Sequence, residues 1–172
     1  MGGFEPQGVV TLKDVLAVTN QQMFYPATTW FDDSLATYNP LNCIGLYAAA
    51  PVQAPNDEGY AVARIPSNVS QAKIYLVFIQ GADNPTRPMV FQWTFLAGLC
   101  AQAYDTINRG TFPDTVAAGG TFGTILCDHV FDMSTMGLSP GDYLAFKVTG
   151  LAGDAFTDAT NLWFLGILID WS

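Results

Sequence analysis

Apolar and polar residues alternate regularly near the C-terminal end of the chain. After a Pro140-Gly141-Asp142 turn, Leu144, Phe146 and Val148 fall on one face of residues 143–148. A period of two residues is typical of β-strands. The same alternation over residues 162–171 puts Trp163, Leu165, Ile167, Ile169 and Trp171 opposite Leu162, Phe164, Gly166, Leu168 and Asp170. Because an edge strand this apolar would promote aggregation, we expect it to lie between neighbours in a sandwich or against another subunit.

Further strands are predicted between clusters of Gly, Pro, Asn and Asp. They cover residues 44–49, 59–65, 72–80, 89–97, 99–104 and 124–131, with a loop from Pro113 to Gly120. About eight strands, with almost no helical periodicity, predict an all-β fold. We expect an antiparallel β-sandwich of the jelly-roll type, preceded by a short N-terminal arm.

Two of the predicted strands are apolar on both faces. In residues 72–80, Ile74, Leu76 and Phe78 alternate with Tyr75, Val77 and Ile79, and residues 89–97 behave similarly around Trp93. A strand with two apolar faces is either central or covered by a neighbouring subunit. We therefore expect an oligomer interface that includes Tyr75, Val77, Ile79 and Trp93.

The N-terminal residues differ in composition from the rest of the chain. We predict an arm over residues 1–27 and one sandwich domain over residues 28–172. Residues 11–18 are predicted to form a short helix or a short strand. The arm carries Phe4, Met23, Phe24 and Tyr25, which we expect to dock onto a partner. The alternative is that its last residues form the first strand of the domain.

The low content of charged residues limits the classes of partner that we expect. Half of the 172 residues are hydrophobic, 12% are charged, and the net charge is -9. The six cations are scattered and form no basic stripe, so nucleic acid is not expected as a partner. Such a surface is expected to be partly covered by protein partners, the alternative being a large core. With no signal peptide or apolar run of membrane-spanning length, the protein is expected to be soluble and made in the cytosol.

Catalytic and metal-binding patterns are weak. Cys43, Cys100 and Cys127 have no paired spacing and are interpreted as small core residues in a reducing compartment. Cys127 could neighbour His129 on a strand, yet no oxyanion loop accompanies the pair, so a structural histidine is favoured. Asp154 and Asp158 offer hard oxygen ligands for calcium without a regular ligand spacing, and solvated turn residues are the favoured interpretation. We expect no enzyme activity, cofactor or metal.

Several segments together resemble the jelly-roll modules of tailed-bacteriophage virion proteins. They are Tyr60-Ala61-Val62-Ala63-Arg64-Ile65-Pro66, Ala72 to Phe78, Phe91-Gln92-Trp93, Gly141 to Val148, Gly153-Asp154-Ala155 and Leu165 to Trp171. The resemblance covers residues 58–171. It implies a structural subunit of the virion, often trimeric, that decorates or cements the head by binding the major capsid protein or another virion protein. A tail or fibre module is the alternative position.

The aromatic residues allow a function of another class. Sugar-binding sandwiches stack rings on Tyr and Trp beside a few polar groups. The candidates in or near predicted loops are Trp30, Tyr38, Tyr47, Tyr60 and Tyr104. They predict either a carbohydrate site used in host attachment or the anchors of a protein interface.

Overall fold

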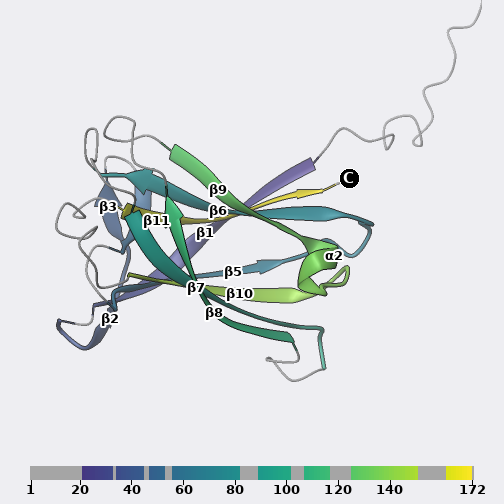
Figure 1. Ribbon diagram of the computed structural model, residues 1–172, viewed down its shortest axis with the longest axis horizontal. Helices are drawn as coiled ribbons and strands as arrows, with labels where there is room; N and C mark the ends of the chain where they lie inside the picture. Colours follow the sequence, from purple (N-terminus) through teal and green to yellow (C-terminus); the bar gives the residue numbers. More distant parts are fainter. Residues whose placement is uncertain are drawn as a thin grey trace, which may run out of the picture.

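Two layers of antiparallel strands face each other in the computed structural model (Figure 1). The structure describes residues 21–32, 34–44, 47–52, 56–81, 89–101, 107–116, 125–150 and 162–171. Its elements are β1 (Gln21–Asp32), β2 (Thr37–Asn39), β3 (Asn42–Ile44), β4 (Tyr47–Pro51), β5 (Glu58–Arg64), β6 (Ala72–Gln80), β7 (Met89–Gly98), β8 (Ile107–Val116), β9 (Ile125–Asp132), α2 (Met133–Met136), β10 (Tyr143–Gly150) and β11 (Leu162–Trp171).

The strand order is that of a jelly roll. Sheet A contains β4, β11, β6 and β9 in that order, and sheet B contains β5, β10, β7 and β8. Successive strands of the chain thus alternate between the layers, except that β7 and β8 are neighbours. Strand β1 belongs to both layers, because its first half pairs with β11 and its second half with β2 and β5. The predicted fold class is confirmed.

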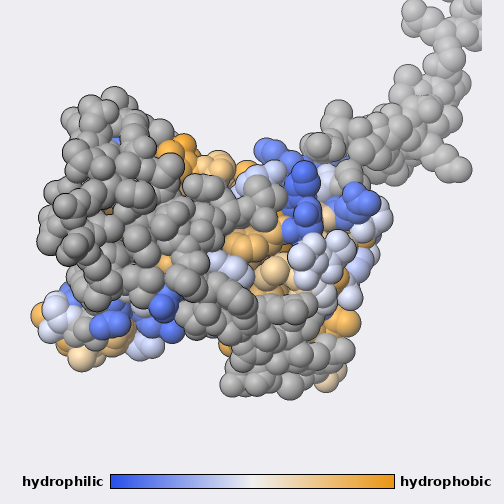
Figure 2. Space-filling model, in the orientation of Figure 1, coloured by the Kyte–Doolittle hydropathy of each residue, from blue (hydrophilic) through white to orange (hydrophobic). Residues whose placement is uncertain are grey.

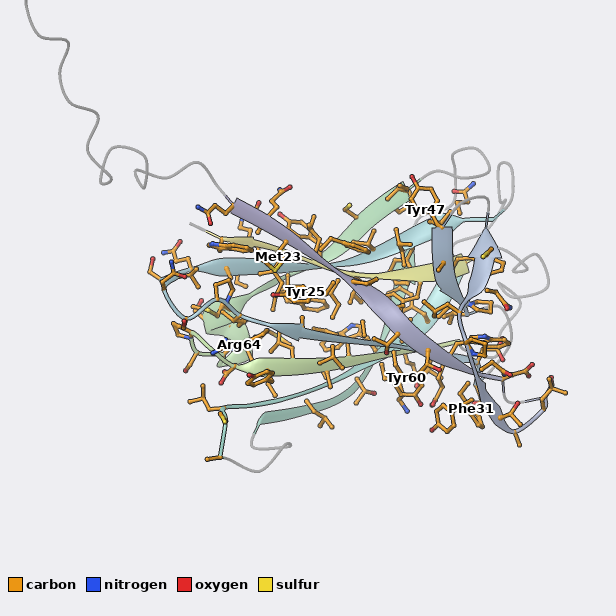
Figure 3. The ribbon with its side chains drawn as sticks, turned by 180° about the vertical axis from the view of Figure 1, so that it is seen from behind. Met23, Tyr25, Phe31, Tyr47, Tyr60 and Arg64 are labelled. Carbon is orange, nitrogen blue, oxygen red and sulfur yellow. The ribbon has the colours of Figure 1, made fainter. Side chains whose placement is uncertain are left out.

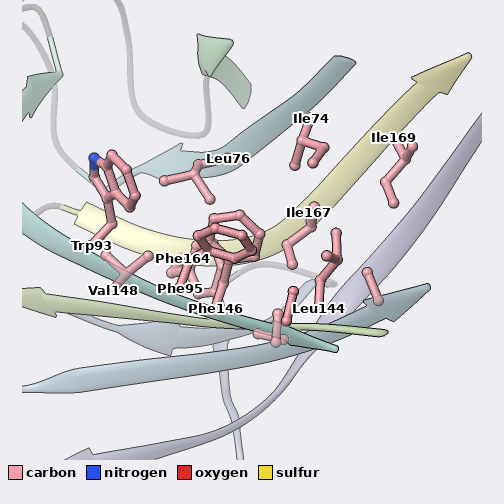
Figure 4. Packing of buried hydrophobic residues seen from close by; sticks show 14 of the residues in the cluster. Ile74, Leu76, Trp93, Phe95, Leu144, Phe146, Val148, Phe164, Ile167 and Ile169 are labelled. Carbon is pink, nitrogen blue, oxygen red and sulfur yellow. The ribbon is translucent and has the colours of Figure 1, made fainter. Parts of the chain in front are cut away.

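Phenylalanine rings fill the space between the sheets (Figure 4). Phe78 of β6 lies 5.0 Å from Phe91 of β7 and 5.6 Å from Phe164 of β11, measured between ring centroids. Phe95 stacks on Phe146 of β10 at 5.3 Å. All five side chains are essentially inaccessible to solvent. Contacts between rings of different sheets hold the layers together through dispersion and apolar burial.

The regular alternation predicted for β11 is interrupted at Gly166. The register of β11 against β6 shifts between Phe164 and Gly166, so the strand contains a β-bulge. Gly166 has φ 147°, and a Cβ added there would meet the carbonyl oxygen of Tyr25 and lie 2.8 Å from the Cα of Pro26. The bulge reverses the faces. Leu162, Phe164, Ile167 and Ile169 face the core, and Leu165 and Leu168 lie on the outer side.

Two predictions about the middle of the chain are wrong. Leu99 to Ala101 lie outside the strands, and Ala101 has φ 70°, so the strand predicted from Leu99 does not begin there. Conversely, the predicted loop from Pro113 overlaps β8. Proline is tolerated because β8 ends the strand order of sheet B, where a missing N–H need not break a central ladder. The single strand predicted over residues 44–49 corresponds to parts of β3 and β4.

The predicted boundary at residue 27 falls inside β1. Gln21 pairs with Trp171, and the ladder continues to Pro26 opposite Gly166. Met23, Phe24 and Tyr25 are therefore strand residues, and the Tyr25 hydroxyl donates a 2.8 Å hydrogen bond to the carbonyl of Arg64. For these three residues the structure shows the alternative prediction, in which they form the first strand of the domain. Phe4 and residues 11–18 lie outside the described residues.

All three cysteines are exposed, contrary to their expected place in the core. Cys43 lies on the short strand β3, Cys100 in the turn after β7, and Cys127 on β9, where its side chain faces outward. For Cys127, apolar neighbours in the sequence do not identify the core side, because both faces of sheet A carry apolar residues. Each thiol is free. Among the described residues, the structure contains no helix long and apolar enough to cross a membrane.

The turn before β10 depends on the buried carboxylate of Asp142. Its Oδ2 accepts a 2.7 Å hydrogen bond from the backbone N–H of Ser139, and its carbonyl accepts one from Ile65 at 2.9 Å. We expect Asp142→Ala to lower the free energy of unfolding by about 1–3 kcal/mol, because the Ser139 N–H loses its partner. Urea denaturation measures the loss. Ser139→Ala is the control, since only its backbone takes part, and equal losses would contradict this role of Asp142.

Candidate functional site

The outer face of sheet A carries an apolar groove of about 270 Å³. Three of its lining side chains are large and partly exposed: 42% of Phe24, 47% of Tyr47 and 44% of Ile125 is accessible to solvent. We call this surface the sheet A groove. Its lining residues are Phe24, Tyr47, Val77, Ile125, Cys127, Leu165 and Leu168. None of these residues is charged. The groove therefore offers shape and apolar surface, and little for polar recognition.

A second apolar cluster underlies this groove and shares Val77 and Leu165 with its lining. Ala49, Val77, Ile79 and Leu165 are buried together on the outer side of sheet A, separate from the core between the sheets. Of the predicted interface residues, Val77 and Ile79 belong to this cluster. Tyr75 is half-buried and lies on the same face of β6. Sequence alternation thus identified the outer face of β6.

Trp93, the fourth predicted interface residue, faces the core instead. Only 8% of its side chain is exposed, and its ring meets Phe131 edge to face at 4.6 Å. On β7 the buried face contains Phe91, Trp93 and Phe95, and the outer face carries the half-buried Gln92 and Thr94. Trp93 is therefore not available on the outer surface.

One end of the sandwich is polar. Figure 2 shows hydrophilic residues gathered where β1 begins and β11 ends. A pocket of about 130 Å³ in this region is lined in part by Lys73, Asp132 and Asp170, and Lys73 pairs with both aspartates in the strand registers. Within the described ranges, no cluster of three or more His, Cys, Asp or Glu residues is arranged to hold a metal ion.

Three aromatic rings form a row on the outer face of sheet B. The Tyr38 ring centroid lies 5.0 Å from that of Phe31 and 5.9 Å from that of Tyr60. Phe31 and Tyr60 come from β1 and β5 (Figure 3), and Tyr38 comes from β2. Register explains the meeting, because Phe31 is opposite Tyr38 on one side and Glu58 on the other. Tyr38 is 66% exposed, so its ring is presented to solvent.

An ion pair adjoins this row of rings. Lys147 Nζ lies 2.7 Å from Glu58 Oε1, and the Tyr60 hydroxyl donates a hydrogen bond to Glu58 Oε2. Burial raises the pKa of the Tyr60 phenol, and its hydrogen bonds to Glu58 and Tyr38 raise it further. Tyr60 is therefore a neutral hydrogen-bond donor throughout the physiological pH range. We call Phe31, Tyr38, Tyr60, Glu58 and Lys147 the Tyr38 patch.

The structure brings together two of the five aromatic candidates, Tyr38 and Tyr60. Trp30 is buried in β1 and donates a 3.0 Å hydrogen bond to the carbonyl of Pro40, while Tyr47 lies in the sheet A groove. Tyr104 is outside the described residues, as are Asp154, Asp158 and the side chain of His129. Phe31, Glu58 and Lys147 were not predicted as part of a site. Their position depends on the pairing of β1 and β10 with β5, which no local pattern reveals.

Comparisons with known proteins give structural matches only. No family model matches the sequence, and no curated protein matches it. The CBM36-1 domain of a multidomain xylanase from the hindgut metagenome of Trinervitermes trinervoides matches 87% of this chain with 96% of its own, at 10% identity and TM-score 0.43.

Two viral structures also match at low similarity. The enzymatically active domain of tailspike protein 4 from bacteriophage CBA120 covers 90% of this chain with 19% of its own, at 12% identity and TM-score 0.33. A structure of infectious bursal disease virus, Gx strain, covers 98% with 54% of its own, at 13% identity and TM-score 0.34. At this level of similarity, functional inference depends on the residues of the chain itself.

Proposed function

We propose that the protein is a non-enzymatic structural subunit of a bacteriophage particle that assembles as a homotrimer through the outer face of sheet A. The observation that carries the proposal is the sheet A groove, where Phe24, Tyr47 and Ile125 expose apolar surface next to a second buried cluster. Grouped apolar surface of this kind is typical of protein interfaces. Covering the exposed part of an apolar side chain that is already about half buried stabilises an assembly by roughly 1 kcal/mol.

The uncharged lining allows a second copy of this chain to occupy the groove. Identical subunits that each carry a net charge of -9 repel one another, so an interface between them needs a centre without like charges. The uncharged lining of the groove meets that requirement. Closed symmetry buries such a surface without producing filaments. The number three follows from the resemblance to trimeric jelly-roll virion modules.

The same resemblance supports a position on the capsid exterior, as a decoration or cement protein bound to the major capsid protein. Met23, Phe24 and Tyr25 belong to β1, so the proposal assigns attachment to residues 1–20 and leaves the outer face of sheet A to trimer formation. A tail or fibre position remains the alternative. Its discriminating experiment is immunogold labelling of particles, which would mark the head for a decoration protein and the tail for the alternative.

Ile125→Asp is expected to convert the trimer to monomers. Ile125 is 44% exposed at the start of β9, so the single chain tolerates a carboxylate there, whereas a buried and unpaired carboxylate destabilises an interface strongly. Sedimentation at micromolar concentration measures the change. Val62→Asp is the matched control, because Val62 is 54% exposed on the outer face of sheet B and its variant should remain trimeric. A monomeric unmodified protein would overturn the proposed assembly.

The three exposed thiols provide a second readout on the unmodified protein. Cys127 lines the sheet A groove, whereas Cys43 and Cys100 lie outside it. In the trimer, maleimide should modify Cys127 much more slowly than the other two, and Ile125→Asp should remove the difference. Peptide mass spectrometry after timed labelling measures each site. Equal labelling of all three thiols in a protein that sediments as a trimer would place the interface on another surface.

A further inference from the structure

We propose that the Tyr38 patch on sheet B binds a neutral carbohydrate, with the Tyr38 ring as the stacking surface and the Glu58–Lys147 pair as the hydrogen-bonding partner of sugar hydroxyls. The patch lies on the outer face of sheet B, whereas the proposed trimer interface lies on sheet A. The two proposals therefore depend on different residues. Loss of trimer formation and loss of sugar binding are separately measurable.

The first support is the exposed and fixed ring of Tyr38. An aromatic side chain that is 66% accessible to solvent contributes little to the core, yet this ring contacts Phe31 at 5.0 Å and Tyr60 at 5.9 Å. The neighbouring planes are tilted by 53° and 49°, so both neighbours limit the motion of Tyr38 without covering it. A ring already restricted in this way loses little conformational entropy when a ligand stacks on it.

The second support is the distribution of donors and acceptors beside the rings. Glu58 accepts one hydrogen bond from Lys147 and one from Tyr60, and two carboxylate oxygens together have about four acceptor sites. Lys147 has three donors, of which Glu58 takes one, and 36% of its side chain is exposed. Neighbouring hydroxyl groups of a sugar both donate and accept, so an adjacent carboxylate and ammonium match them well.

The charge of the patch selects a neutral ligand. Its only cation is already paired with Glu58, and the whole chain carries a net charge of -9. Phosphates, nucleic acids and acidic polysaccharides would meet repulsion that a single paired lysine does not offset. A pyranose ring presents apolar C–H groups on its face and hydroxyls at its rim. That combination fits a tyrosine face bordered by a carboxylate and an ammonium group.

Purified full-length protein on an array of neutral gluco-, xylo-, galacto-, manno- and chito-oligosaccharides tests the proposal, with titration calorimetry on the best array ligand. We expect binding that Tyr38→Ala weakens about tenfold and Tyr38→Phe largely retains, because the ring face is kept. Glu58→Gln and Lys147→Met should each weaken binding severalfold, through loss of hydroxyl partners. Tyr143→Ala is the matched control, because Tyr143 is 48% exposed on the same sheet beside Arg64, away from the patch.

Two results would overturn the proposal. One is the absence of binding to every neutral oligosaccharide on the array. The other is binding that Tyr38→Ala and Tyr143→Ala reduce equally, which would place the sugar elsewhere. A decaproline peptide is tested beside the sugars, because aromatic surfaces also dock extended proline-rich chains. If that peptide binds through Tyr38 and no sugar does, the Tyr38 patch is a peptide site. Circular dichroism of each variant separates loss of binding from loss of folding.

Discussion

Gly166→Ala is expected to lower the free energy of unfolding by about 3–5 kcal/mol, the sum of backbone strain and a steric collision. Gly166 has φ 147°, a conformation that is open almost exclusively to glycine. A methyl group there would also collide with the Tyr25 carbonyl oxygen and come within 2.8 Å of the Pro26 Cα. Because these atoms belong to the backbone of a paired strand, they cannot move away without breaking the β1–β11 ladder.

Urea denaturation of Gly166→Ala should be compared with that of Gly141→Ala. Gly141 also has a positive φ, 89°, but its nearest neighbour to an added Cβ is Leu99 Cδ2 at 3.6 Å, an ordinary contact. Backbone strain alone should therefore cost Gly141→Ala about 1–2 kcal/mol. The difference between the two variants measures the collision with β1. Equal losses would mean that the β1 backbone does not lie against Gly166 of β11.

Phe78→Ala is expected to be about as damaging, with a loss of about 3–5 kcal/mol. The Phe78 ring is fully buried and contacts Phe91 of the opposite sheet as well as Phe164 of its own sheet. Its removal leaves a cavity at the centre of the sandwich, and rings anchored on two different sheets cannot close it easily. Thermal and urea denaturation measure the loss.

The matched control for Phe78 is Val62→Ala. Val62 is 54% exposed on β5, so its truncation creates no cavity and should change stability by about 0.5 kcal/mol or less. Phe78→Leu should recover part of the loss, because it fills some of the volume. If Phe78→Ala and Val62→Ala cost the same, Phe78 does not occupy the core between the sheets.

Strands with uninterrupted alternation were predictable from the sequence. Residues 72–80 coincide with β6, and residues 143–148 lie inside β10, because their inner faces are determined by local period-two patterns. The faces of β11 were only half predicted. Its bulge exists because β1 passes over Gly166, a contact between residues 140 positions apart that alternation cannot encode. Exposed cysteines were missed for a similar reason, since an apolar neighbourhood in sequence does not identify the side of the sheet.

The candidate sites, too, were only partly predictable from local sequence patterns. Tyr75, Val77 and Ile79 were expected on one face, and they are, but Phe24 and Ile125 join that surface only through strand order. Tyr38 and Tyr60 were plausible as single exposed rings. Their meeting with Phe31 requires the hairpin of β1 and β2 to lie beside β5, and the partner of Glu58 comes from β10, 89 residues away. Long-range register determines the chemistry of this surface.

Strand β1 has a consequence for how the protein can fail. It covers one side of β11 in sheet A and one side of β5 in sheet B, so a single strand closes both layers (Figure 1). Detachment of β1 would expose two unpaired edges at once, and each presents N–H and C=O groups that readily accept a foreign strand. The same opening would allow β1 of one copy to replace that of another. Domain swapping of β1 between copies is therefore the expected route by which this fold would form unwanted oligomers at high concentration.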